Sequence, residues 1–153
     1  MVNSDLLWTI EDSGNKNNIY GLDAKGNIIK DIDVKDVRCD YILLTHGHQD
    51  HVLDVENIAA NNPNVLLVSN YEIVVYYQER GIKGHPLNHG GKKNFDFGTL
   101  KYVNAVHTSS FPDGSYGGQP GGFIIEADKT IYIAGDTALT YDMKLIGKGF
   151  DLD

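Results

Sequence analysis

Four side chains able to bind a metal lie within six residues, namely His46, His48, Asp50 and His51. They follow the apolar stretch at 41–44, which predicts a strand ending just before them. Imidazole and carboxylate groups bind borderline divalent cations such as zinc, and four ligands at one strand-to-helix junction can be shared between two adjacent ions. The spacing therefore predicts a metal site: the first two histidines approach from an extended segment, and the last two residues open the next helix.

Two later residues stand where a shared site would need them. His107 ends the apolar-rich run at 100–106, and Asp136 follows the strand-like run at 130–134 within a Gly-Asp-Thr sequence. Both residues come just after the C-terminal end of a predicted strand. We therefore expect them to meet the first cluster at one edge of a sheet.

The order of these residues is H-x-H-x-D-H, then a lone histidine, then Gly-Asp-Thr, and it resembles the metallo-β-lactamase superfamily of metal-dependent hydrolases. Segments at 85–91, 106–114 and 134–139 are similar to an uncharacterised branch of these hydrolases close to the ascorbate-phosphate lactonases. The resemblance covers about residues 31–149. It implies an α/β fold, the αββα sandwich, in which helices cover the outer faces of two packed sheets.

The resemblance also implies a role for each candidate ligand. It makes His46, His48 and His107 the ligands of one ion, Asp50 and His51 ligands of a second, and Asp136 the bridge between the ions. Members of the superfamily usually carry a further strand-end histidine, whereas the last histidine here is His107. We therefore expect the second site to be weak or empty and the sandwich to be truncated at its C-terminus.

This ligand set predicts a metal-dependent hydrolase. Zinc is the favoured ion, and manganese or iron would also suit histidine and carboxylate ligands. A bound divalent ion lowers the pKa of its water from about 15.7 to about 7, so hydroxide could attack an ester, lactone, amide or phosphodiester bond of a small-molecule substrate. The resemblance implies that Asp50 orients the water or takes its proton. His89, Ser109 and Ser110 are candidate substrate contacts. The alternative is an inactive metal-binding fragment or interaction module of the same fold.

The N-terminal residues 1–33 have a different pattern. Short apolar runs separated by Gly and Asn turns at 12–15 and 23–27 predict a β-meander. This piece resembles a single blade of a β-propeller, which would make it a foreign or fused segment before a metallo-β-lactamase-like domain at 34–153. The other interpretation is that these strands supply the first sheet of the hydrolase.

Composition limits the kinds of partner. The net charge of -8 argues against binding to nucleic acid or an anionic membrane, which requires clustered basic residues. Cys39 is the sole cysteine, so no internal disulfide can form and a reducing compartment is favoured. The sequence shows neither a leader segment nor a run of about 20 apolar residues, so we predict a cytoplasmic protein. A half sandwich would expose an apolar sheet face, which predicts a homo-oligomer.

Strands and helices are expected to alternate in the first part of the main domain, and consecutive strands are expected to follow. An apolar helical stripe at 52–61 ends before Pro63, and a second at 71–80 is closed by Gly81. Strands are predicted at 41–45, 64–68, 93–97, 99–106, 121–127 and 130–134, with a last helix at 141–147.

Overall fold

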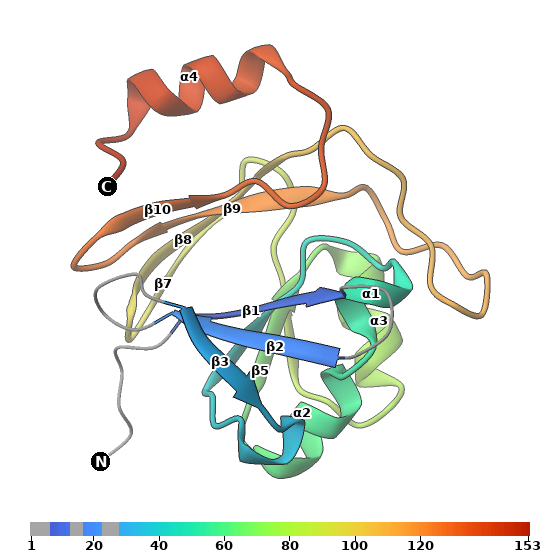
Figure 1. Cartoon of the computed structure of the whole chain (residues 1–153). Helices are drawn as coiled ribbons and strands as arrows, with labels where there is room; N and C mark the ends of the chain where they lie inside the picture. Colours follow the sequence, from blue (N-terminus) through green and yellow to red (C-terminus); the bar gives the residue numbers. More distant parts are fainter. Residues whose placement is uncertain (1–6, 13–16, 23–27) are drawn as a thin grey trace.

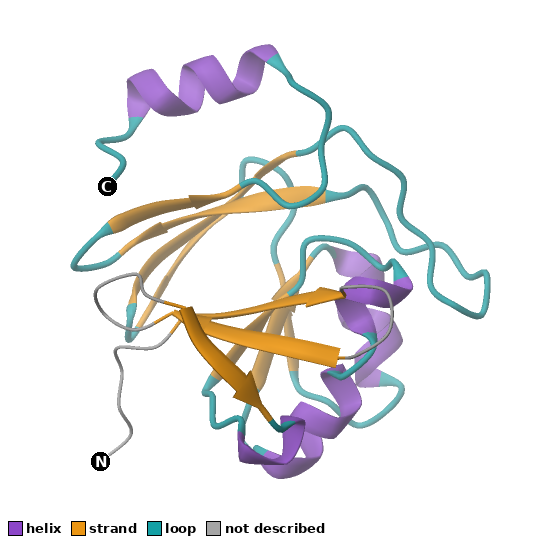
Figure 2. Ribbon diagram, viewed as in Figure 1, coloured by secondary structure: helices purple, strands orange, loops and turns teal. Residues whose placement is uncertain are grey.

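A computed structural model describes residues 7–12, 17–22 and 28–153 of the chain. A group of helices, a parallel sheet, an antiparallel sheet and a last helix follow one another as layers (Figure 1), and a small N-terminal sheet lies beside them (Figure 2). This arrangement explains how distant parts of the sequence reach one edge of the molecule.

The parallel sheet and its helices come from the first half of the main domain. The elements are β4 (Tyr41–Leu43), α1 (Gln49–Val52), α2 (Val55–Asn61), β5 (Leu66–Ser69), α3 (Tyr71–Gln78) and β6 (Gly84–Pro86). The strands pair in parallel in the order β4-β5-β6. Leu67 of β5 and Leu44, which directly follows β4, pack with the helix residues Ile73 and Tyr77 in one buried cluster. The Asn70 side chain caps α3 by accepting a hydrogen bond from the Ile73 backbone N–H (2.9 Å).

The antiparallel sheet comes from the second half. Its elements are β7 (Lys92–Phe95), β8 (Gly98–Asn104), β9 (Gly121–Glu126) and β10 (Thr130–Ile133), followed by α4 (Tyr141–Gly149). The strand order is β10-β9-β8-β7. Successive side chains of a strand point to opposite faces. Val103 and Ile124 accordingly pack with Ile146 of α4, while their neighbours Tyr102 and Phe123 face the other side.

The main core lies between the two sheets. Val68 of the parallel sheet packs there with Leu100, Tyr102 and Phe123 of the antiparallel sheet, and all four side chains are fully buried. Burying an aliphatic or aromatic side chain of this kind stabilises a fold by about 1.5–3 kcal/mol. Helix, sheet, sheet and helix are thus held together as the αββα sandwich, which confirms the predicted fold class.

The N-terminal strands form the predicted β-meander. They are β1 (Leu7–Asp12), β2 (Asn17–Leu22) and β3 (Ile28–Ile32), paired antiparallel in that order. β1 lies against α1. The predicted turns lie largely outside the described residues. A short 3-10 helix, η1 (Val34–Asp36), leads on to β4, and the Asp33 side chain caps it. The division of the chain at residue 33 into two domains stays a prediction.

Three local predictions were inaccurate. The single helix expected at 52–61 is two helices, because the chain leaves helical geometry at Asp54 (φ -107°, ψ 7°) before α2 begins. The strand expected at 99–106 ends at Asn104. β6 was missed because it has only three residues, of which Gly84 and Pro86 both have low strand propensity.

Several large apolar side chains of the described residues are exposed near α4. Leu139 is 91% exposed, Tyr141 79% and Leu145 63%. Such side chains favour association when they are contiguous. The expected homo-oligomer stays a prediction, which light scattering would test. In the described part of the chain, every helix is too short or too polar to cross a membrane.

Candidate metal centre

Hydrogen bonds from both sheets fix the point at which β4 gives way to the histidine cluster. The Ser69 hydroxyl of β5 donates to the carbonyl of Leu44 (2.6 Å). The Tyr102 hydroxyl of β8 and the backbone N–H of Gly121 both donate to the carbonyl of Thr45, each over 3.0 Å. The cluster therefore starts from a rigid junction between the sheets.

The turn through Gly47 is tied to the loop that follows His107. The Gly47 backbone N–H donates to the Ser109 hydroxyl (3.0 Å), which donates in turn to the carbonyl of Gly117 (2.9 Å). A Cβ atom at Gly117 would lie 2.5 Å from the Ser109 oxygen, so the residue must be glycine for the loop to approach this closely. The two histidine-bearing segments are thus held side by side.

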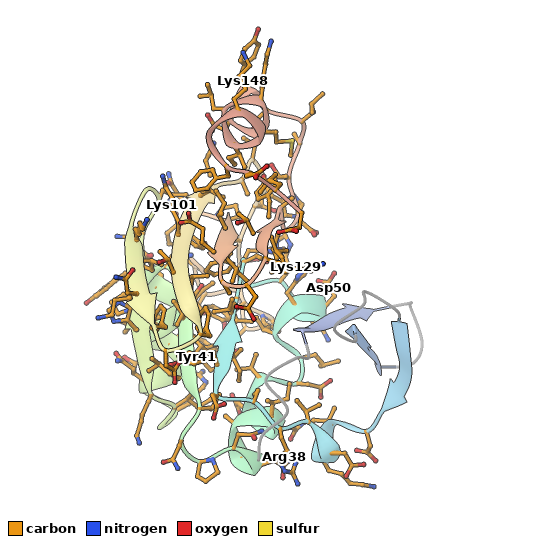
Figure 3. The ribbon with its side chains drawn as sticks, turned by 90° about the vertical axis from the view of Figure 1, so that its left-hand side faces the viewer. Arg38, Tyr41, Asp50, Lys101, Lys129 and Lys148 are labelled. Atoms are coloured by element: carbon orange, nitrogen blue, oxygen red, sulfur yellow. The ribbon has the colours of Figure 1, made fainter. Side chains whose placement is uncertain are left out.

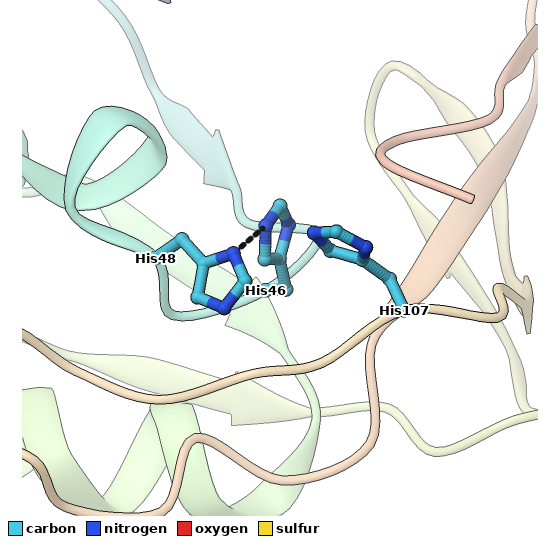
Figure 4. Close-up of side chains that lie close together, drawn as sticks. All are labelled: His46, His48 and His107. Atoms are coloured by element: carbon cyan, nitrogen blue, oxygen red, sulfur yellow. Dashed lines mark hydrogen bonds between the residues drawn. The ribbon is translucent and has the colours of Figure 1, made fainter. Parts of the chain in front are cut away.

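Three imidazoles from these two segments form the first group. His46, His48 and His107 each offer one nitrogen, and these nitrogens all lie within 4.8 Å of one another. Nε2 of His46 lies 3.0 Å from Nδ1 of His48 (Figure 4). Nitrogens bound to one tetrahedral zinc ion at about 2.0–2.1 Å would be separated by about 3.4 Å. The group has the composition of a three-histidine metal site, and its His46–His48 nitrogen separation is close to this value.

Asp136 lies between this group and a second one. Its Oδ2 is 3.6 Å from Nε2 of His107 and 3.9 Å from Nε2 of His46, whereas its Oδ1 is 3.4 Å from Nε2 of His51. The second group consists of His46, His51 and Asp136. Asp50 lies on α1 (Figure 3). Its Oδ2 is 3.5 Å from Nε2 of His51. One carboxylate therefore presents an oxygen to each group, as a bridging ligand would.

Two backbone features carry Asp136 to this position. Gly135 has φ 65°, and a Cβ atom there would lie 2.9 Å from the Thr45 Cβ. The Val106 backbone N–H donates to the Thr137 hydroxyl (2.8 Å), and the Ala138 N–H donates to the carbonyl of Val106 (3.0 Å). The segments that carry His107 and Asp136 are therefore paired with each other.

His46 is the buried member of the cluster, with no exposed surface. Burial, together with the positive charge that His51 and His48 would carry, lowers its pKa from 6.5 to about 4. The ring is therefore neutral near pH 7. A neutral imidazole has a free lone pair, which is the form that binds a metal.

This lowered pKa predicts that the metal-free protein loses stability in mild acid. Below pH 6.5 the unfolded chain gains a proton at His46, whereas the folded chain stays neutral down to about pH 4. The contribution of His46 to the free energy of unfolding is fully present above pH 6.5 and falls by about 3 kcal/mol as the pH is lowered from 6.5 to about 4. Urea unfolding at pH 7 and 4.5 in a chelating buffer measures it. The fall in the free energy of unfolding should be smaller for His46→Gln than for the wild type. Equal falls in the two proteins would show that His46 is not the group responsible.

The three predicted substrate contacts lie in different surroundings. Ser109 is buried (7% exposed), and both hydrogen bonds of its hydroxyl are used within the fold, as described above. His89 lies beside the ring of Tyr102, and its Nε2 is 2.9 Å from the carbonyl of Pro120. Ser110 is exposed and its backbone bridges to Tyr116. Contact of these three residues with substrate stays a prediction.

Sequence reasoning missed two residues that support the site. Tyr102 reads as an ordinary core residue of β8, yet its hydroxyl reaches Thr45. Thr108 was not singled out, although its hydroxyl is 3.2 Å from Nε2 of His48. Its position directly after His107 was the one available signal.

Comparison with known proteins supplies the family. Residues 29–152 match the beta-lactamase superfamily domain. The UPF0173 metal-dependent hydrolase of Christiangramia forsetii is 63% identical over 123 residues, which cover 80% of this chain and 54% of that protein. The UPF0173 metal-dependent hydrolase YtkL of Bacillus subtilis is 47% identical over 129 residues, covering 80% of this chain and 56% of that protein. The chain thus spans about half the length of these curated relatives.

Two solved structures share the fold. Igni18, a metallo hydrolase from Ignicoccus hospitalis, aligns with a TM-score of 0.73 and 25% identity over 97% of this chain and 68% of that one. A putative metal-dependent hydrolase from Parabacteroides distasonis aligns with a TM-score of 0.56 and 25% identity over 86% of this chain and 61% of that one.

These comparisons overturn the suggested likeness of residues 3–33 to a propeller blade. An alignment with Igni18 over 97% of the chain takes in the N-terminal strands as well, so they belong to a region shared with a metallo hydrolase. The matched residues carry both the sandwich and all six candidate ligands. The chain therefore belongs to the metallo-β-lactamase superfamily and is related within it to the UPF0173 metal-dependent hydrolases.

Proposed function

We propose that the protein is a metal-dependent hydrolase that acts on an ester, lactone, amide or phosphodiester bond of a small molecule. The observation that carries this proposal is the position of Asp136, whose Oδ1 faces His51 while its Oδ2 faces His46 and His107. A single structural ion would not need a shared carboxylate. The names of the relatives support the general class of reaction.

The residues present fit a divalent ion. His46, His48 and His107 would hold the first ion, Asp50 and His51 would contribute to a second, and Asp136 would be shared. Zinc is the proposed metal because three imidazoles suit it well, and manganese or iron are the alternatives. When bound, the ion supplies a water of lowered pKa and polarises the carbonyl or phosphoryl oxygen of the substrate.

The exposure of the side chains is graded across the site. The His46 side chain is 0% exposed, that of His107 36%, that of Asp136 44% and that of Asp50 49%. The site is thus closed beneath His46 and open on the side of the two carboxylates. We propose that substrate enters on this open side, where Asp50 orients the attacking water or accepts its proton.

A second candidate is a metal-binding module without turnover. The observation in its favour is that His46 belongs to both groups of the described residues. If the first ion takes His46, the second is left with Asp50, His51 and the shared Asp136. An ion at the first group alone would bind without a complete two-ion site. The weak or empty second site expected from the sequence agrees with this candidate.

We also propose a cytoplasmic location. Burial raises the pKa of the Cys39 thiol to about 11, so the thiol stays protonated and unreactive. A single inert thiol fits a reducing compartment.

A hydrolysis screen separates the two candidates. The zinc- or manganese-loaded protein is offered bis-p-nitrophenyl phosphate, a lactone panel and a thioester. The hydrolase proposal expects turnover of at least one class, loss of turnover in His107→Ala, and unchanged turnover in His85→Ala, a histidine outside both groups. Bound metal without turnover of any substrate would favour the binding module.

A further inference from the structure

The rings of His46 and His48 face each other through different nitrogen atoms. His46 presents Nε2 and His48 presents Nδ1, and these two atoms are 3.0 Å apart. The remaining nitrogen of each ring faces a threonine hydroxyl. Oγ1 of Thr45 lies 3.1 Å from Nδ1 of His46, and Oγ1 of Thr108 lies 3.2 Å from Nε2 of His48.

Metal binding would impose a definite proton position on each ring. A neutral imidazole carries one N–H and one lone pair, and the lone pair must face the ion. The proton is then on the outer nitrogen, which is Nδ1 in His46 and Nε2 in His48. An outer N–H needs an acceptor, and a threonine hydroxyl has acceptor capacity.

We propose that Thr45 and Thr108 are positioning residues that set the tautomers and ring orientations of His46 and His48. The inference rests on the proposed metal-binding function and extends it to two residues that are not ligands. Partners that accept the outer N–H of a metal-bound histidine fix its ring and raise its basicity. Since Thr108 lies in the loop after His107, it also links that loop to the first histidine segment.

The two threonines should differ in importance. His46 is fully buried, so removal of the Thr45 hydroxyl leaves a ring N–H without an acceptor and without water. His48 is only half-buried, and Thr108 is exposed, so water can replace the lost hydroxyl. Loss of such partners typically weakens metal affinity by about 10 to 100-fold. We expect about 100-fold for Thr45→Val and about 10-fold for Thr108→Val.

The test measures zinc affinity by competition with a chromophoric chelator in five variants: Thr45→Val, Thr45→Ser, Thr108→Val, Thr108→Ser and Thr99→Val. Both Ser variants keep the hydroxyl and should bind like the wild type. Thr99 is the matched control, because its hydroxyl bonds to Asn94 on the neighbouring strand and not to a histidine. Equal affinity of the wild type and both site Val variants would overturn the proposal.

A second readout is independent of affinity and activity. In ¹⁵N NMR spectra of the zinc-loaded wild type, His46 should carry its proton on Nδ1 and His48 on Nε2, and the Thr108→Val variant should exchange the His48 ring proton faster. The opposite tautomers would overturn the proposal. A wild type that binds no zinc would instead defeat the proposed function, whereas zinc binding without hydrolysis would leave the positioning role intact.

Discussion

Replacement of both His46 and His48 by alanine is expected to abolish stoichiometric binding of zinc. The two rings supply two of the three nitrogens of the first group, and their facing atoms lie 3.0 Å apart. In the double variant, His107, His51 and the carboxylates of Asp50 and Asp136 remain, so only two of the four clustered imidazoles are left and the three-histidine group is lost. Equilibrium dialysis against zinc, followed by elemental analysis, measures the bound ion.

The matched control removes two other histidines. His85 lies on β6 and His89 beside Pro120, and neither belongs to a ligand group of the described residues. The pair His85→Ala with His89→Ala should keep its zinc. Retention of one tightly bound ion in the His46 and His48 double variant would show that the metal lies elsewhere.

Asp136→Asn is expected to reduce hydrolysis by more than about 100-fold, the upper end of the effect for residues that only support a ligand. The amide keeps the size of the side chain but loses the charge and one of the two equivalent oxygens that face His51 and His107. The weak occupancy of a second ion at high zinc concentration should also disappear.

The matched control for this substitution is Asp142→Asn. Asp142 lies on α4, where it accepts a hydrogen bond from the Asn104 side chain, and belongs to neither ligand group. The Asp142→Asn protein should hydrolyse substrate at the wild-type rate. An Asp136→Asn protein with the wild-type rate and wild-type metal content would rule out the bridging role.

The segments that carry the candidate ligands could be predicted because the pattern that marks them lies within a few neighbouring residues of the sequence. His46, His48, Asp50 and His51 are close in sequence, and the strand before them is clear from its apolar run. The rule that ligands gather at strand ends placed His107 near them. The structure brings His46, His48 and His107 together in one group and His46 and His51 with Asp136 in another. Asp50 belongs to neither group but lies 3.5 Å from His51.

Other features depend on tertiary contacts that no local pattern contains. Ser109 looks like a polar loop residue, but it is buried because the loop folds back on Gly47. The break at Asp54 interrupts a stripe whose periodicity is continuous in the sequence. Tyr102 supports the site through its hydroxyl although its ring is part of the core.

The propeller likeness failed for a related reason. Short apolar runs separated by Gly and Asn turns are typical of any antiparallel meander. The pattern at 3–33 therefore predicted the strands β1 to β3 but could not show which larger fold they join. The contact of β1 with α1 places this sheet beside the helix that carries His51.

Anomalous scattering at the zinc edge from crystals of the zinc-loaded protein tests the central claim most directly. We predict a peak at about 2.0–2.1 Å from Nε2 of His46, Nδ1 of His48 and Nε2 of His107, with Asp136 beside it. A fully occupied peak at another place, or zinc-saturated crystals with no peak at these three nitrogens, would contradict the metal centre and the hydrolase function that depends on it.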